Sequence, residues 1–301
     1  MALLALSGFV QTHDATIVKE NGVYYRVQTG MGIPVSVSKD LHHWDLLGKI
    51  FEENPLWTSR AIPGSTSLWA PEIVFRNGEW RVYYSVSTFG SQKSAIGLVV
   101  NKTLDPASPE YCWHDLGCVL QSDESCRYNA IDPAVISDEQ GNDHLLFGSF
   151  WGGLQMVPLT KQGFVVKDAE VVNIASRRTD PNPVEGGFII RKDGYYYLFA
   201  SYDFCCRGTA STYHIVCGRS ENLYGPYYDS IGESFLESGG DTLRDGFSFK
   251  KWAGPGHNSV FADDDGKYYL VYHAYDREDD GEPKLLIEEL FFENGWPKVK
   301  V

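Results

Sequence analysis

Three acidic residues occupy matching places in a pattern that the sequence repeats. Asp14, Asp132 and Glu185 each stand 8 or 9 residues before a glycine that closes a polar turn; these glycines are Gly22, Gly141 and Gly194. Three carboxyl groups suit glycoside hydrolysis, in which one protonates the leaving oxygen and a second activates water or attacks the sugar. The third can tune the proton donor, because neighbouring charges move pKa values apart. Any one of these acids could instead belong to a turn, as the Asp-Pro step at Asp132 indicates.

The pattern occurs five times, always as a short apolar strand, a polar turn with glycine at or near its end, and a second strand rich in Tyr, Phe, Leu and Val. The copies are DATIVKENGVYYRV from Asp14, APEIVFRNGEWRVYYSV from Ala70, DPAVISDEQGNDHLLFGSF from Asp132, EGGFIIRKDGYYYLFASY from Glu185 and NSVFADDDGKYYLVYHAY from Asn258. Successive turn glycines are 53 to 72 residues apart, so five units fill the chain.

A more polar stretch follows each hairpin, such as residues 94–106, and also looks strand-like, which makes about four strands per unit. There is no convincing amphipathic helix, and 30 Gly and 14 Pro are scattered as turn signals. Four-stranded sheets repeated radially, with both faces covered, form a β-propeller. The sequence therefore predicts an all-β fold, a five-bladed β-propeller with four-stranded antiparallel blades, in a single domain over residues 1–301. A β-sandwich with accidental repeats is the alternative.

The predicted ring would bring the acids together. Equivalent positions at the start of each innermost strand surround the central axis; counted back from the turn glycines, they are Asp14, Ala70, Asp132, Glu185 and Asn258. Ionisable groups are costly to bury without partners, so three carboxyl groups at one axis indicate a functional site.

Aromatic residues flank these positions. Trp69 precedes the second hairpin, Phe89 follows its second strand, and Trp151 follows the third hairpin. Aromatic faces at strand ends around a polar funnel suit an oligosaccharide, although most of the 8 Trp and 18 Tyr must pack the blades. His257, beside Asn258, is either a structural histidine or a neutral imidazole that binds an ion or orients an acid.

The amino-acid composition limits the kinds of molecule that the protein could bind. A net charge of −14 and a pI of about 5.0 argue against nucleic acid and anionic membranes, which bind clustered Lys and Arg. No apolar run reaches the ~18 residues that cross a bilayer, and the first residues lack the basic start of a signal peptide. GxSxG, HExxH, Walker and GxGxxG patterns are absent, which disfavours serine hydrolase, zinc protease, phosphoryl-transfer and dinucleotide chemistry.

The 6 cysteines form no CxxC pair and have no histidine at zinc-finger spacing, so a structural zinc site is disfavoured. We expect most of them to be buried as small apolar residues, with one or two bridges at most.

The chain resembles the glycoside hydrolase family 43 arabinanases, five-bladed propellers that cut α-1,5-linked arabinan. The resemblance covers nearly the whole chain and rests on HDATIVKENGVYY, LWAPEIVFRNGEWRVYYSVSTFGSQKSAIGL, LDPASPEYCWHDLG, YNAIDPAVI, GSFWGGL, VEGGFIIRKDGYYYLFASYDFCCRG and GPGHNSVF. It implies that Asp14 is the general base, Glu185 the general acid, and Asp132 the residue that modulates the pKa of the acid and orients it. It also implies inversion of configuration, which requires about 6.5–9.5 Å between base and acid.

The resemblance further implies that His257 helps to bind a calcium ion or another cation at the propeller centre, mostly through waters, and that no organic cofactor is needed. Residues implied to line the sugar subsites are His13, Trp69, Phe89, Asn129, Ser149 and Trp151.

An arabinan hydrolase is therefore expected, with endo action favoured and exo action possible. We expect a monomer that acts outside the cell or in the periplasm after loss of an export signal, with a cytoplasmic location left open. The partner is a polysaccharide, arabinan or arabino-oligosaccharides, with no nucleic acid and no membrane. The alternatives are an α-L-arabinofuranosidase or β-xylosidase of the same family, or a non-catalytic carbohydrate-binding propeller.

Overall fold

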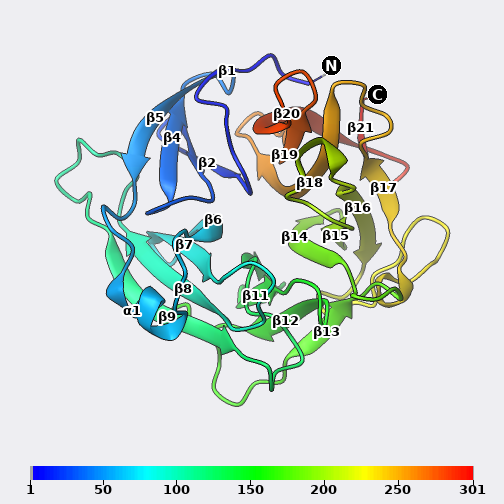
Figure 1. The fold of residues 1–301 in the computed structure, drawn as a ribbon, viewed down its shortest axis with the longest axis horizontal. Helices are drawn as coiled ribbons and strands as arrows, with labels where there is room; N and C mark the ends of the chain where they lie inside the picture. The colour runs from blue at the N-terminus through cyan, green and yellow to red at the C-terminus, as the bar shows by residue number, and fades with distance from the viewer. Residues whose placement is uncertain (1–2, 301) are drawn as a thin grey trace.

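A computed structural model describes residues 3–300, which form five sheets around a central axis (Figure 1). Each sheet is one consecutive stretch of chain, and its four antiparallel strands follow one another from the axis outward. The arrangement is a five-bladed β-propeller, which confirms the predicted fold class.

The first blade contains β2 (Thr16–Glu20), β3 (Val23–Val27), β4 (Pro34–Ser38), β5 (His43–Lys49) and a fifth strand, β1 (Ser7–Gly8), which pairs parallel with β5. The second contains β6 (Trp69–Arg76), β7 (Glu79–Val86), β8 (Ser94–Asn101) and β9 (His114–Ser122). The third contains β10 (Ala134–Ser137), β11 (Asp143–Phe147), β12 (Leu154–Pro158) and β13 (Val172–Ala175).

The fourth blade contains β14 (Val184–Lys192), β15 (Tyr195–Tyr202), β16 (His214–Ser220) and β17 (Asp241–Arg244). The fifth contains β18 (Trp252–Ala262), β19 (Tyr268–Asp276), β20 (Glu282–Glu293) and β21 (Trp296–Val299). The helical elements are α1 (Leu56–Ala61) and the 3₁₀ turns η1 (Gly208–Ala210) and η2 (Phe235–Glu237). At 6 residues, α1 is too short to produce a helical period in the sequence.

Type I′ turns explain where three of the five innermost hairpins form. Both central residues of a type I′ turn need positive φ, which Asn-Gly and Asp-Gly tolerate best. Asn21 and Gly22 have φ of 49° and 79°, and the same conformation recurs at Asn77-Gly78 and Asp193-Gly194. The turn glycines read from the sequence therefore mark real hairpins.

Apolar side chains fill the space between neighbouring blades. Five core clusters are present among residues 3–300, one at each blade interface. In β15, Tyr196, Leu198 and Ala200 pack toward the third blade, while Tyr197 and Phe199 pack toward the fifth. Because successive residues of a strand face opposite sides, a sheet covered on both faces needs a run of apolar residues such as this one.

The ring closes through side chains and the N-terminal segment. The Ser259 hydroxyl donates to the Ala15 carbonyl at 2.9 Å, and the Lys19 ammonium contacts the Asp263 carboxylate at 2.6 Å. After β1, the chain runs beside the fifth blade, where the N–H of Leu285 donates to the carbonyl of Val10 at 2.8 Å. The first and fifth blades therefore meet without exchanging a strand among residues 3–300.

All six cysteines are unbonded, within the expected limit of two bridges, and only Cys217 is buried, so the expectation that most are buried was wrong. The Sγ atoms of Cys205 and Cys206 lie 2.7 Å apart. Within residues 3–300, no helix has the length and apolar character needed to cross a lipid bilayer.

Candidate active site

One residue in each blade turns the chain into the innermost strand with a left-handed backbone. These ring residues, with their φ angles, are Asp14 (53°), Ala70 (43°), Asp132 (58°), Gly186 (57°) and His257 (48°). A positive φ is uncommon for residues other than glycine, and strained backbone of this kind gathers at functional sites. Two of the three predicted acids, Asp14 and Asp132, are ring residues.

The third acid, Glu185, lies one residue before the ring position of its blade, so counting back from glycine misplaced it by one residue. In β14 it pairs with Ser201, just as Trp69 pairs with Ser85 in the second blade. A β-bulge follows each pair. Glu185 therefore shares a tier with Trp69, nearer to the start of the strand than the ring.

In the fifth blade the position counted back from the glycine lay one residue after the ring residue. His257 is the ring residue there, and Asn258 follows it inside the bulge of β18. His13 occupies the tier of Glu185 in the first blade, since its carbonyl accepts the N–H of Thr29 at 3.2 Å. Glu185 and two predicted sugar-binding residues, His13 and Trp69, thus lie at one level along the axis. This level is one residue nearer to the strand starts than the level of Asp14 and Asp132.

The backbone N–H of every ring residue except Gly186 donates to a side chain at one equivalent position of the preceding blade. The holding residue lies seven positions after the turn glycine. The bonds to ring N–H groups are Ala70 to Thr29 Oγ1 (2.8 Å), Asp132 to Ser85 Oγ (2.9 Å), His257 to Ser201 Oγ (2.7 Å) and Asp14 to His273 Nδ1 (3.3 Å).

The exception, Gly186, brings Asp132 close to the predicted acid. The third blade has Gly148 at the holding position, and glycine has no side chain to accept a hydrogen bond. The N–H of Gly186 donates instead to Oδ2 of Asp132, at 3.2 Å. Because Gly186 follows Glu185 directly, Asp132 anchors the backbone from which Glu185 projects.

Asp14 is surrounded by groups that favour its ionised form. Thr29 donates to Oδ2 at 2.6 Å, and Nδ1 of His257 lies 3.3 Å from Oδ1. Burial would raise the pKa of Asp14, but the surrounding histidines, His257 foremost, and the Thr29 hydroxyl lower it to about 2. The carboxyl group is therefore ionised at neutral pH, as a general base must be.

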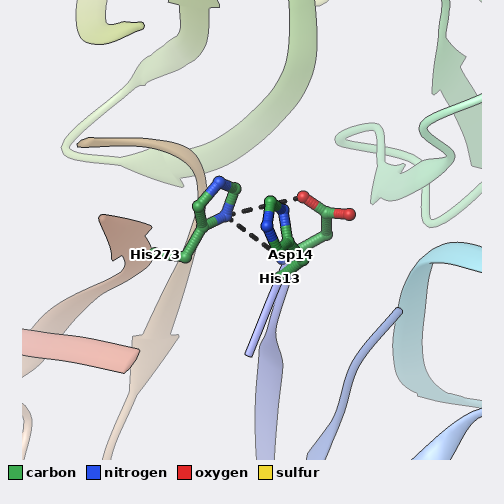
Figure 2. A group of neighbouring side chains, drawn as sticks. All are labelled: His13, Asp14 and His273. Carbon is green, nitrogen blue, oxygen red and sulfur yellow. Dashed lines mark hydrogen bonds and ion pairs between the residues drawn. The ribbon is translucent and has the colours of Figure 1, made fainter. Parts of the chain in front are cut away.

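His13 and His273 lie on the same side of Asp14 and project toward it (Figure 2). Burial lowers the pKa of His273 well below its usual value, so its ring is neutral at neutral pH. Since Nδ1 accepts the N–H of Asp14, its own proton is on Nε2. Burial also lowers the pKa of His13, whose ring centroid lies 4.2 Å from that of His273.

His257 places its imidazole ring beside the carboxyl groups at the axis. Burial would lower its pKa, but the three carboxyl groups, Asp14 foremost, raise it above the usual value. Burial raises the pKa of Asp132; the charge of His257 opposes this effect, and the two neighbouring acids add to it. The ionisation of Asp14, Asp132 and His257 is therefore coupled.

Ser149 is the partner of the predicted acid, since its hydroxyl donates to Oε2 of Glu185 at 2.7 Å. Ser149, which was predicted to bind sugar, therefore contacts the acid itself. Trp151 follows two residues later, is 42% exposed, and is anchored through its carbonyl by Asn182. This loop places an aromatic face near the acid.

Two other predicted subsite residues are less closely tied to the acids. Oδ1 of Asn129 is buried without a hydrogen-bond partner among residues 3–300. Phe89 is 82% exposed in the loop after β7.

Potential cation ligands occur at two places. His13, Asp14 and His273 offer ligand atoms within 4.8 Å of one another, a group that does not include His257. A small cavity at the axis, about 10 Å³, is lined in part by Asp14, Glu72, Asp132, His257 and Asn258. Both amide atoms of Asn258 are buried there without partners among the described residues. The carboxylate and amide oxygens in this lining are the ligand type that suits a hard cation such as calcium, the ion expected beside His257.

Thr29 and His273 were missed in the sequence. Each stands seven residues after its turn glycine, like Ser85 and Ser201. Counting forward from the glycines, as well as back, would have found both.

A five-bladed propeller with three carboxyl groups at one end of its axis, beside exposed aromatic rings, is a carbohydrate-cleaving hydrolase. Residues 6–297 match the model of Glycosyl hydrolases family 43, and the chain belongs to this family. Both the expected family and the expected glycoside hydrolase class are confirmed.

Similar proteins are described as arabinan-cleaving enzymes. The chain is 42% identical to an extracellular exo-alpha-(1->5)-L-arabinofuranosidase of Cellvibrio japonicus, over 96% of this chain and 86% of that protein. It is 40% identical to an extracellular endo-alpha-(1->5)-L-arabinanase of Bacillus subtilis, over 95% and 86%. The structure of Cellvibrio cellulosa alpha-L-arabinanase complexed with arabinohexaose has a TM-score of 0.92 and 42% identity, over 96% and 95% of the two chains.

Proposed function

We propose that this protein hydrolyses α-1,5-linked L-arabinan with inversion of configuration, Asp14 being the base and Glu185 the acid. The observation that carries the proposal is the two-tier arrangement of the acids, with Glu185 one residue nearer the strand start than Asp14 and Asp132. A sugar that approaches the axis would reach the acid first and have the ionised base beyond it. Relatives described as endo and exo enzymes on α-1,5-linked arabinan support this substrate.

In the proposed reaction, Asp14 accepts a proton from water while the water oxygen forms a bond to the anomeric carbon. The bond from that carbon to the leaving oxygen breaks, and Glu185 gives its proton to that oxygen. Thr29 and His257 stabilise the charge of Asp14 before the proton arrives. Ser149 orients the carboxyl group of Glu185, and Asp132 holds the backbone beside it and tunes the acid.

A calcium ion is proposed at the axis, near His257, with the acids and the Asn258 amide as possible partners. When bound, it would supply positive charge that offsets part of the acidic cluster. Within the protein, the Thr29 hydroxyl and the His257 ring contact the two oxygens of Asp14 and favour its ionised form.

We further propose that the protein acts outside the cell as a monomer, with one catalytic domain over residues 1–301. The relatives named extracellular support this location. His13, Trp69, Phe89, Asn129 and Trp151 are proposed to contact the sugar chain.

Digestion of linear arabinan followed by chromatography tests the proposal. Release of reducing sugar is expected; a ladder of oligomers would identify endo action, and a single short product from the start would identify exo action. Absence of cleavage, with cleavage of aryl xylosides or arabinofuranosides instead, would replace arabinan by the substrates of the other family members. Binding of arabinan without any cleavage would overturn the enzymatic role.

A further inference from the structure

Thr29 makes two hydrogen bonds that together fix the direction of its proton. Its hydroxyl accepts the N–H of Ala70 at 2.8 Å and lies 2.6 Å from Oδ2 of Asp14. A backbone N–H can only donate, so the single hydroxyl proton of Thr29 points at the carboxylate. Hydrogen bonds to an ionised acceptor are stronger and shorter than neutral ones, as the 2.6 Å separation illustrates.

The equivalent serines of two other blades make only one of these two hydrogen bonds, the one that accepts a ring N–H. Ser85 and Ser201 accept the ring N–H groups of Asp132 and His257, and among residues 3–300 neither hydroxyl donates to a carboxylate. Holding the ring therefore requires only an acceptor at this position. The bond from Thr29 to Asp14 is an addition specific to the first blade.

We propose that Thr29 is a positioning residue for the general base, an inference that rests on the proposed function. Asp14 is held at its N–H by His273, at Oδ2 by Thr29 and beside Oδ1 by His257. These contacts leave the carboxylate one orientation. Because a base must lie within hydrogen-bond reach of the water that it activates, a small misplacement lowers the rate without weakening sugar binding.

Thr29→Val tests this role, since valine keeps the shape and removes the hydroxyl. We expect kcat on linear arabinan to fall about tenfold to a hundredfold, the range for loss of a hydrogen bond to a charged group, with KM little changed. Thr29→Ser restores the donor and should recover most of the rate. The acidic limb of the pH profile of kcat/KM should move to higher pH in the valine variant, because one interaction that lowers the pKa of Asp14 is lost.

Leaving-group dependence separates loss of base function from loss of acid function. A dinitrophenyl glycoside of an α-1,5-arabino-oligosaccharide needs little proton donation but still needs activated water. Thr29→Val should lose the same factor on this glycoside as on arabinan, whereas Glu185→Gln should lose far less on the glycoside.

Ser201→Ala is the matched structural control, because it leaves the N–H of His257 without its partner just as Thr29→Val leaves that of Ala70. It should lower the melting temperature similarly with a smaller loss of kcat. The inference is overturned if Thr29→Val keeps the wild-type kcat, if its loss shrinks on the dinitrophenyl glycoside, or if Ser201→Ala loses as much. Failure of the wild-type protein to cleave either substrate would refute the proposed function instead.

Discussion

The Ser149 hydroxyl donates to Oε2 of Glu185 at 2.7 Å, the hydrogen bond that orients the proposed acid. Replacing Ser149 by alanine should reduce kcat on linear arabinan about tenfold or more, because the carboxyl group loses its fixed orientation. The loss should be smaller on a dinitrophenyl glycoside, which needs little proton donation. Steady-state kinetics on the two substrates provide the comparison; equal losses on both would show that Ser149 does not act through the acid.

Asp14 and His257 depend on each other for their ionisation. Asp14 is the largest influence that raises the pKa of His257, so Asp14→Asn should lower that pKa and burial should then dominate. NMR titration of the His257 imidazole measures the change. An unchanged or higher pKa in the variant would show that Asp14 is not the controlling partner.

The same coupling predicts how stability depends on pH. The pKa of His257 is raised in the folded protein, so its protonation adds stability below about pH 6.5 that is lost as the pH rises through the folded value. Urea unfolding of the wild type and of His257→Gln from pH 5 to pH 9 should therefore give a stability difference that shrinks toward high pH. A difference that grows with pH would contradict this assignment.

Removal of divalent cations tests the proposed axial ion. Chelation should lower both the melting temperature and the rate on arabinan, and added calcium should restore both, because the cation offsets acids that are buried together. Asn258→Ala should weaken the response to calcium. Identical melting temperatures and rates with and without chelator would remove the ion from the account.

Trp151 and Phe89 should affect binding more than folding. Both rings are exposed, at 42% and 82%, so their removal leaves the blade cores intact. Alanine at either position should raise KM for arabinan severalfold with little change in melting temperature, as expected for lost stacking. An unchanged KM for Phe89→Ala would place this residue outside the sugar groove.

The fold followed from the sequence because glycine turns and apolar strands have local signatures. Gly22, Gly78 and Gly194 each complete a type I′ turn, and strands such as β15 are apolar throughout because both faces are covered. Once five similar units are recognised in the sequence, the symmetry of a propeller predicts that acids far apart in the chain lie together at the axis.

The details of the site required the structure. Gly186 stands 8 residues before its turn glycine, as Asp14 and Ala70 do, whereas His257 stands 9 residues before its own, as Asp132 does. The sequence alone did not show which count applies in which blade. The partnership of Asp132 with Gly186 of the fourth blade accompanies the absence of a side chain at Gly148, in the same blade as Asp132. Such a relationship becomes visible only when the blades are placed side by side.

The central claim, that Asp14, Asp132 and Glu185 form one hydrolytic site, is tested most directly by reducing-sugar release from linear arabinan. Asp14→Ala, Asp132→Ala and Glu185→Ala should each lose at least about a hundredfold in rate while keeping the wild-type circular dichroism spectrum. A folded Glu185→Ala protein that cleaves arabinan at the wild-type rate would contradict the account.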